Sequence, residues 1–248
     1  MTKAELKDFL DHKYESFNNE AFIEEDPILI PHGFTKKQDV EISGFLAATI
    51  AWGQRKTIIN NAKSMMERMD HDPHSYVMEA TENDMKSLNG FVHRTFNDID
   101  LKHFVVALRR IYNDQGLEAL FQGGVLDGMQ QLQQYFFPGD HPVRTQKHVA
   151  NPLKGSSAKR INMFLRWMVR KDHRGVDFGL WKTVKPSQLF LPLDVHTGNV
   201  ARQLKLLSRK QNDWKAVEEI TQALRKFDPE DPIKYDFALF GLGVYEKF

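Results

Sequence analysis

The sequence predicts an all-α protein built from about ten helices. Nearly every segment places apolar residues at helical spacing, whereas the longest run with strand spacing is Phe190–Leu193. Capping residues such as Thr2 and Asp213 stand where these segments begin, and Gly or Pro stands where several of them end. The 248 residues contain no repeat, no low-complexity tract and no flexible linker, so any two lobes must pack closely.

The expected helices follow one another along the whole chain. They cover 2–17, 35–52, 55–66, 74–80, 82–88, 99–113, 125–137, 156–171, 194–204, 214–227 and 232–246. The helix after Thr35 is apolar on most sides, which predicts a buried core helix. Segment 26–34 is expected to be extended, because its prolines disfavour helix at the residues before them. Segment 139–155 is expected to be mostly loop, and 1–24 to join the C-terminal part.

Composition excludes several classes of protein. Apolar residues make up 41% of the chain and charged residues 27%, which is ordinary for a globular protein. The absence of cysteine excludes disulfides, thiol catalysis, Cys-ligated zinc and cysteine-bound iron–sulfur clusters. No apolar run approaches the roughly 20 residues that span a bilayer, and the N-terminus lacks the apolar core of a signal peptide. We therefore expect a soluble, cytoplasmic protein without a membrane partner.

Charge is unevenly distributed along the chain. Residues 1–50 contain five Lys/Arg and ten Asp/Glu, whereas residues 141–174 contain nine Lys/Arg and a single acid, Asp172. Such a basic block is typical of a surface that binds polyanions, although a solvated helix face is the more common origin of a charge run. The chemistry beside the block decides between the two.

Lys159 and Asp194 carry the sharpest chemical signal in the sequence. If Ser156 caps the helix 156–171, Lys159 lies in its first turn, where the helix dipole disfavours an ammonium and favours the neutral amine that Schiff-base formation needs. Asp194 precedes a helical pattern, so it is placed as an N-cap whose carboxylate could also stabilise a developing cation or activate a nucleophile. A surface ion pair for Lys159 and a simple cap for Asp194 are the structural alternatives.

Four segments resemble the base-excision DNA glycosylases of the endonuclease III and 8-oxoguanine glycosylase superfamily. Gly155-Ser-Ser-Ala-Lys159-Arg-Ile-Asn-Met-Phe-Leu resembles the second half of the helix-hairpin-helix, Leu-Pro-Gly-Val-Gly-x-Lys-Thr-Ala, and Lys159 falls on its Schiff-base lysine. Leu191-Pro-Leu-Asp194-Val-His-Thr-Gly-Asn-Val-Ala-Arg resembles the following Pro-Val-Asp-Thr-His-x-x-Arg-Val segment, and Asp194 falls on its catalytic aspartate. Upstream, the helix ending in Trp52-Gly-Gln54 and the segment Asn89-Gly-Phe-Val-His-Arg94 resemble the gap-filling glutamine and the base-pocket segments. The chain is closest to an uncharacterised bacterial family within or beside this superfamily.

The resemblance implies a DNA-repair enzyme that flips a damaged base out of a duplex and excises it, with or without lyase activity at the abasic site. It implies one glycosylase-like domain over 1–248, with lobes at 35–150 and 151–210, a cleft between them, and 1–34 and 211–248 packed against them. Lys159 and Asp194 would be catalytic. The DNA-binding residues would be Gln54, Lys154, Gly155, Ser156, Ser157 and Arg160, and the base pocket would be lined by Trp52, Phe91, His93 and Arg94. Trp167 is a further candidate, for which core packing is the expected role.

Departures from the family pattern leave an alternative open. Ser157 replaces the second hairpin glycine, and the loop 171–190 lengthens the spacing between Lys159 and Asp194. A glycosylase fold that binds nucleic acid without catalysis is therefore the second hypothesis, since fold does not fix function. His196 has no second ligand at a metal spacing, so we expect no metal site there. We also expect no cofactor and a monomer.

Overall fold

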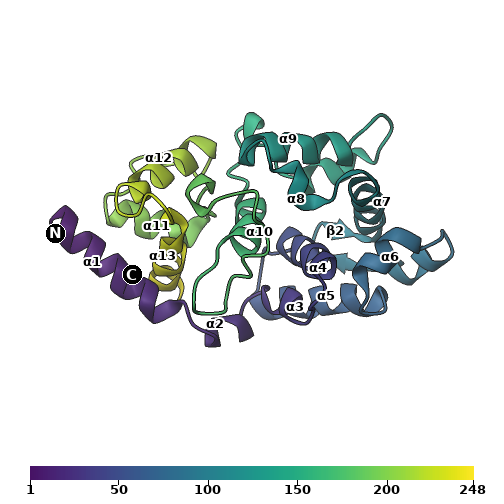
Figure 1. The fold of residues 1–248 in the computed structure, drawn as a ribbon, viewed down its shortest axis with the longest axis horizontal. Coiled ribbons are helices and arrows are strands. Elements are labelled where there is room, and N and C mark those ends of the chain that lie inside the picture. The colour runs from purple at the N-terminus through teal and green to yellow at the C-terminus, as the bar shows by residue number, and fades with distance from the viewer. The chain divides into compact units, whose positions relative to one another are not determined.

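The computed structural model describes residues 1–248 and contains thirteen α-helices, α1 to α13, with one two-stranded sheet (Figure 1). The predicted all-α class is confirmed. The helices outnumber the prediction because α2 (Ala21–Glu24), α3 (Leu29–His32) and α8 (Leu117–Leu120) are single turns, too short to show a helical period in the sequence.

The chain forms two compact units. The central unit comprises residues 23–150, and the terminal unit comprises residues 1–22 together with 151–248. Short 3-10 helices cover Asp84–Leu88, Val143–His148, Pro152–Lys154, Pro186–Gln188 and Pro232–Lys234.

The central unit is organised around a buried helix. Its longer helices are α4 (Lys37–Thr49), α5 (Arg55–Arg68), α6 (Pro73–Glu79), α7 (Asp98–Asp114) and α9 (Val125–Phe136). Every residue of α4 from Asp39 to Thr49 is buried, as its apolar composition predicted. Phe45 of α4 packs on Phe104 of α7 and Phe136 of α9, with ring centroids 6.0 and 5.8 Å away. Burial on all sides therefore makes α4 the core of this unit.

One hairpin in the central unit was not predicted. Strands β1 (Val92–His93) and β2 (Phe96–Asn97) pair antiparallel, with Val92 opposite Asn97 and His93 opposite Phe96. Arg94, at the first position of the two-residue turn, has φ of 54°, a positive value that tight hairpin turns require at this position. Strands of two residues are too short to show the alternation by which a strand is recognised in sequence.

The terminal unit joins the two ends of the chain. Its helices are α1 (Lys3–Phe17), α10 (Lys159–Val169), α11 (Val195–Gln203), α12 (Trp214–Arg225) and α13 (Tyr235–Val244). Thr2 caps α1 through a capping box with Glu5. Figure 1 shows α1 alongside α13, where Gly241 admits the ring of Phe17 so closely that a Cβ at this position would lie 2.2 Å from it. Residues 1–22 are thus held by the C-terminal helix.

Three local predictions were wrong. Segment 26–34 is not extended, because α3 forms within it; Pro31 stands in the first turn of that helix, where its missing N–H removes no helical hydrogen bond. Lys36 rather than Thr35 precedes α4, and its side chain makes no capping bond. The helix expected at 156–171 is shorter, since it begins at Lys159 and ends at Val169.

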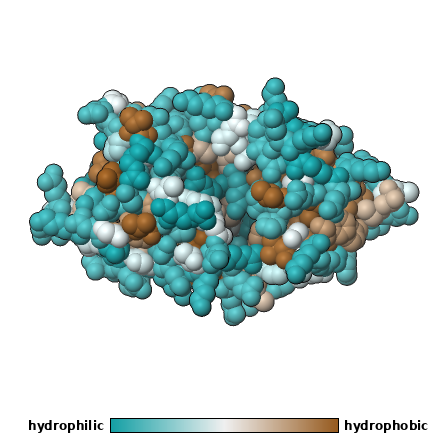
Figure 2. Space-filling model, turned by 180° about the vertical axis from the view of Figure 1, so that it is seen from behind, coloured by the Kyte–Doolittle hydropathy of each residue, from teal (hydrophilic) through white to brown (hydrophobic).

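The surface is mostly hydrophilic, and Figure 2 shows its hydrophobic residues in small separate groups on one face. The most exposed large apolar side chains away from the N-terminus are Val143 at 74% and Leu153 at 70%. No helix is both long and apolar enough to cross a membrane.

Candidate functional site

The terminal unit brings Lys159 and Asp194 together at the starts of two helices. Lys159 is the first residue of α10, and Asp194 is the N-cap of α11, where its Oδ1 accepts a hydrogen bond from the Thr197 amide at 2.9 Å. The other carboxylate oxygen, Oδ2, lies 3.9 Å from Lys159 Nζ, and the two side chains are 25% and 21% exposed. The amine and carboxylate are therefore paired by charge and partly open to solvent, but they are too far apart for a direct hydrogen bond.

The start of α10 differs from the prediction in its cap. Ser156 is not the N-cap; that position belongs to Ala158, which has a left-handed backbone and makes no side-chain capping bond. Ser156 Oγ instead accepts from the Ala158 amide at 3.2 Å. Lys159 nevertheless lies in the first turn, as the first residue of α10.

Residues 154–158, which precede Lys159 and are called the hairpin from here on, are fixed by a segment whose contact with them the sequence did not predict. Ser156 forms a β-bridge with Asp213, and the Trp214 amide donates to Gly155 O at 3.2 Å. From the other side, Asn162 Nδ2 of α10 donates to Ser157 O at 3.2 Å. Asp213 was predicted only as the cap of α12, which it is.

The same segment also supports Asp194. Asn212 Nδ2 donates to Asp194 O at 3.0 Å, and Asn212 Oδ1 accepts from Arg202 Nη2 at 2.6 Å. Loop residues 212–214 therefore hydrogen-bond both the hairpin and the backbone of the carboxylate residue. No sequence pattern predicted that residues 212–214 support these two segments, because the contacts join positions far apart in the chain.

The basic block 141–174 does not form one polyanion-binding surface. Arg166 of α10 and Arg170, the C-cap of that helix, are buried, and both pair with Asp177 from the following loop, at 3.2 and 2.5 Å. Burial also lowers the pKa of Arg160 to about 10. Among the predicted phosphate-binding residues, Lys154, Gly155 and Ser156 are exposed. The charge run is thus divided between an exposed hairpin and an internal ion-pair network.

Asp236 extends this network from α13. Its Oδ2 accepts from Arg166 Nη1 at 2.6 Å, and it is 4% exposed. Burial raises the pKa of Asp236 to about 6, although the Arg166 charge and hydrogen bond act to lower it. The negative charge of Asp194 raises the same pKa, and the positive charge of Lys159 lowers it, so the buried network and the site interact electrostatically. A single acid inside the apolar run of α13 was the sequence signal for this residue.

The remaining predicted site residues lie in the central unit. The Trp52 and His93 rings meet edge to face, with centroids 4.9 Å apart, and the His93 Nε2 atom lies 3.1 Å from Trp52 O. Arg94 lies against Gly53, where φ is +110° and a Cβ would come 2.9 Å from the Arg94 Nη1 atom. Gln54 is exposed and precedes the first residue of α5. Four of the predicted residues, Trp52, Gln54, His93 and Arg94, therefore cluster around one turn.

Two aromatic candidates are core residues. Phe91 is 3% exposed and its ring packs edge to face on Phe96. Trp167 is fully buried in α10, as its apolar helix face led us to expect. Each ring is therefore accounted for by packing. No group of three or more His, Asp or Glu side chains is arranged to hold a metal ion.

Comparison with known proteins gives a family but no activity. No curated protein and no solved structure matches this chain. A family model described as a protein of unknown function, DUF2400, matches residues 26–245, which include every predicted site residue. The chain therefore belongs to the DUF2400 family.

Proposed function

We propose that this protein is a base-excision DNA glycosylase with lyase activity, in which Lys159 is the nucleophile and Asp194 the catalytic carboxylate. The observation that carries the proposal is the 3.9 Å approach of Lys159 Nζ to Asp194 Oδ2, with both side chains partly exposed. Nucleophilic attack at a sugar carbon needs an amine beside a fixed carboxylate. The carboxylate activates the amine and stabilises the positive charge that develops on the sugar.

The chemistry follows from these two groups. Asp194 would pass a proton from the Lys159 ammonium to solvent through one water, and the carboxylate, ionised again, would stabilise the oxocarbenium-like sugar. The Lys159 amine would then bond to C1′ as the glycosidic C1′–N bond breaks and the base leaves with that electron pair. The new adduct loses a proton from nitrogen, and the C1′–O4′ bond breaks as O4′ takes up a proton, which gives an iminium between Lys159 and C1′. Loss of a C2′ proton then allows the C3′–O bond to break, and the phosphate leaves with that electron pair. Water finally releases the lysine.

The geometry of the Lys159–Asp194 pair supports a catalytic role better than a structural one. The ion pairs that stabilise this unit are short and enclosed, such as Arg170 with Asp177 at 2.5 Å. By contrast, a partly exposed pair at 3.9 Å contributes little to folding, since surface ion pairs are worth about 0–1 kcal/mol. Asp194 is held by its cap bond and by Asn212, so its position does not depend on Lys159.

Borohydride trapping tests the proposal. The protein is incubated with a duplex bearing an abasic site and with a panel of damaged-base duplexes, and the imine is reduced to a covalent adduct. We expect an adduct with wild type and none with Lys159→Ala, while the exposed-lysine control Lys226→Ala keeps it. Asp194→Asn preserves an N-cap, since Asn caps about as well as Asp, so it should abolish base release while leaving thermal stability and DNA affinity unchanged.

A nucleic-acid-binding protein without catalysis is the second candidate, favoured by the replacement of the second hairpin glycine by Ser157. It predicts duplex binding with no adduct and no base release on any lesion. An adduct that survives in Lys159→Ala would contradict the assigned nucleophile. Affinity that does not change with salt would exclude both candidates, because phosphate contacts release counterions.

A further inference from the structure

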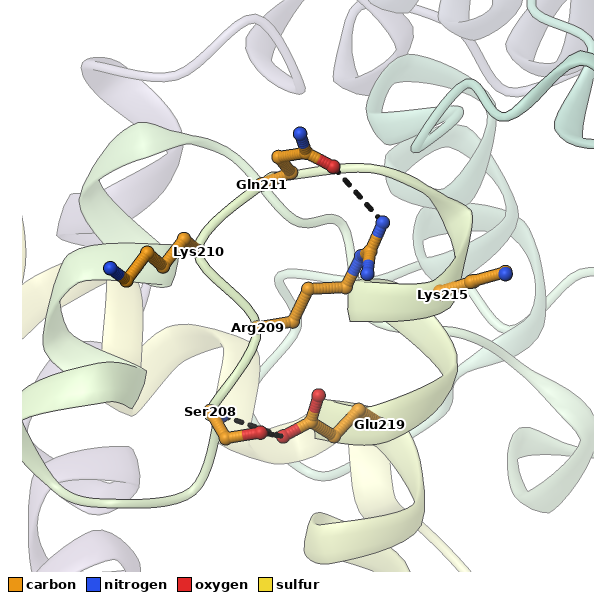
Figure 3. A pocket seen from close by; sticks show the side chains of 6 residues that line it. All are labelled: Ser208, Arg209, Lys210, Gln211, Lys215 and Glu219. Atoms are coloured by element: carbon orange, nitrogen blue, oxygen red, sulfur yellow. Dashed lines mark hydrogen bonds between the residues drawn. The ribbon is translucent and has the colours of Figure 1, made fainter.

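Beside the hairpin lies a surface pocket that the proposed site does not use. It has a volume of about 430 Å³ and is lined by Ser208, Arg209, Lys210, Gln211, Lys215 and Glu219 (Figure 3). These residues belong to the loop between α11 and α12 and to the first turns of α12. The pocket therefore adjoins residues 212–214, which bond the hairpin and Asp194.

The loop is held in one conformation by its own side chains. Arg209 Nε donates to Asp213 Oδ1 at 2.6 Å, and Arg209 O accepts from Arg202 Nε at 2.8 Å. Both the amide and the hydroxyl of Ser208 donate to Glu219 Oε1, each at 2.6 Å. The carboxylates of Asp213 and Glu219 are thus engaged by loop residues.

Two lysines of this pocket have no carboxylate partner. Lys210 and Lys215 are exposed and form no ion pair. Lys215 is not paired even with Glu218, which lies one turn further along α12. In Figure 3 their side chains extend to opposite sides of the pocket, with the Arg209 guanidinium between them. Exposed cations without protein partners suit an anionic ligand that supplies regularly spaced charges.

The position of the loop between α11 and α12, next to the hairpin, indicates which anionic ligand the lysines would bind. Its end is bridged to Ser156 of the hairpin, where Lys154 is also exposed and forms no ion pair. A duplex carries one phosphate charge per about 1.7 Å of axis, so a strand that contacts the hairpin has further phosphates within reach of the adjoining loop. Phosphate contacts of this kind set the register of a protein on nucleic acid without reading sequence.

We propose that Lys210 and Lys215 form a second grip on the nucleic-acid backbone, adjoining the hairpin grip at Lys154–Ser157. The partner is the phosphate backbone of a duplex, and undamaged duplex suffices. This inference rests on the proposed nucleic-acid function but not on its catalytic step. It also explains why the loop is tied to both the hairpin and Asp194, since the two grips must keep a constant spacing.

Fluorescence anisotropy with an undamaged labelled duplex tests the second grip. Wild type and Lys210→Gln/Lys215→Gln are titrated across about 50–200 mM salt, where each phosphate contact contributes about 0.9 to the slope of log K against log salt. We expect the slope of the double variant to be smaller by about 1.8, so that its loss of affinity over this range is about twelvefold less. Trapping yield at saturating DNA should not change.

The matched control is Lys226→Gln/Lys247→Gln, which removes the same charge from exposed lysines elsewhere in the unit. Lys226 follows the last turn of α12, about 16 Å along the helix axis from Lys215 at 1.5 Å per residue. The slope of log K against log salt for this control variant should equal that of wild type. Circular dichroism melts should match for all three proteins. Equal slopes in both double variants and wild type, or an equal decrease in the two variants, would overturn the second grip. Failure of trapping with the slope difference intact would instead refute only the enzyme.

Discussion

The two ends of α10 use basic residues in opposite ways. At its start, Lys159 is a quarter exposed and lies 3.9 Å from its carboxylate. Toward its end, Arg170 is fully buried, with Asp177 at 2.5 Å and Asp231 at 2.8 Å. Both residues belong to one charge run in the sequence, yet one is available for chemistry and the other is part of the core.

The difference comes from what packs against each end. The C-terminal half of α10 is enclosed by α13 and by the loop that supplies Asp177, and the Phe237 ring lies 4.2 Å from the Arg166 guanidinium. Buried guanidinium groups need several acceptors to replace water, and here the surrounding acids supply them. At the N-terminal end, the Lys159 side chain lies near Asp194 at the start of α11 and is 25% exposed, so its amine keeps contact with solvent. The enclosed network at one end therefore holds the helix that carries Lys159 at the other.

The largest expected effect is a loss of stability when the ion-pair network at the C-terminal end of α10 is broken. Arg170→Ala leaves Asp177 and Asp231 without their shared cation, and removing one partner of a buried pair costs about 3–5 kcal/mol. Urea unfolding followed by circular dichroism should show this loss in the free energy of unfolding. Arg174→Ala, which removes a partly exposed arginine paired with Glu15, should cost less than about 1 kcal/mol. Equal losses in the two variants would contradict the contrast between enclosed and open charges.

A smaller effect depends on pH and comes from Asp236. Its pKa of about 6 in the folded protein exceeds the ordinary value of 3.8, so between these values the folded state binds more protons than the unfolded state. The contribution of Asp236 to the free energy of unfolding therefore falls as pH rises through this window, by up to about 3 kcal/mol at 1.36 kcal/mol per unit.

Comparing the Asp236→Asn variant with wild type isolates the pH-dependent contribution of Asp236 to the free energy of unfolding, because Asn imitates the protonated carboxyl at every pH. The variant and wild type should be equally stable near about pH 4, and the variant should gain on wild type as the pH rises to about 7. Unfolding curves measured at intermediate pH values provide the measurement. A constant difference between the two proteins across the window would show that Asp236 does not titrate there.

The smallest expected effect belongs to the open end. Lys159→Ala should change the free energy of unfolding by less than about 1 kcal/mol, because a partly exposed ion pair contributes little. Asp194→Ala should cost about 1 kcal/mol, since it removes the cap bond to the Thr197 amide. Thermal melts measure both. A loss of several kcal/mol on removing Lys159 would mean that the lysine is structural, which would weaken its assignment as nucleophile.

Local pattern was sufficient for most of the helices. Helices α1 and α12 begin after Thr2 and Asp213, the caps that the sequence predicted, and α4 is buried as its composition predicted. The predictions failed where a segment was short, as in the hairpin β1–β2, or where proline was tolerated in a first turn, as in α3. Periodicity needs several turns or residues to accumulate, so these elements could not be recognised from it.

The sequence by itself determined the all-α class, because helical spacing of apolar residues repeats over several turns in most segments. It also determined the cap at Asp194 and the first-turn position of Lys159, because each of these depends on residues within one helical turn. Only the tertiary structure decided that these two residues meet, that Arg166 and Arg170 are buried, and that loop 212–214 bonds both the hairpin and Asp194. Those contacts join residues from 7 to 57 positions apart. Their partners are selected by the packing of α10, α11 and α13, which no local pattern encodes.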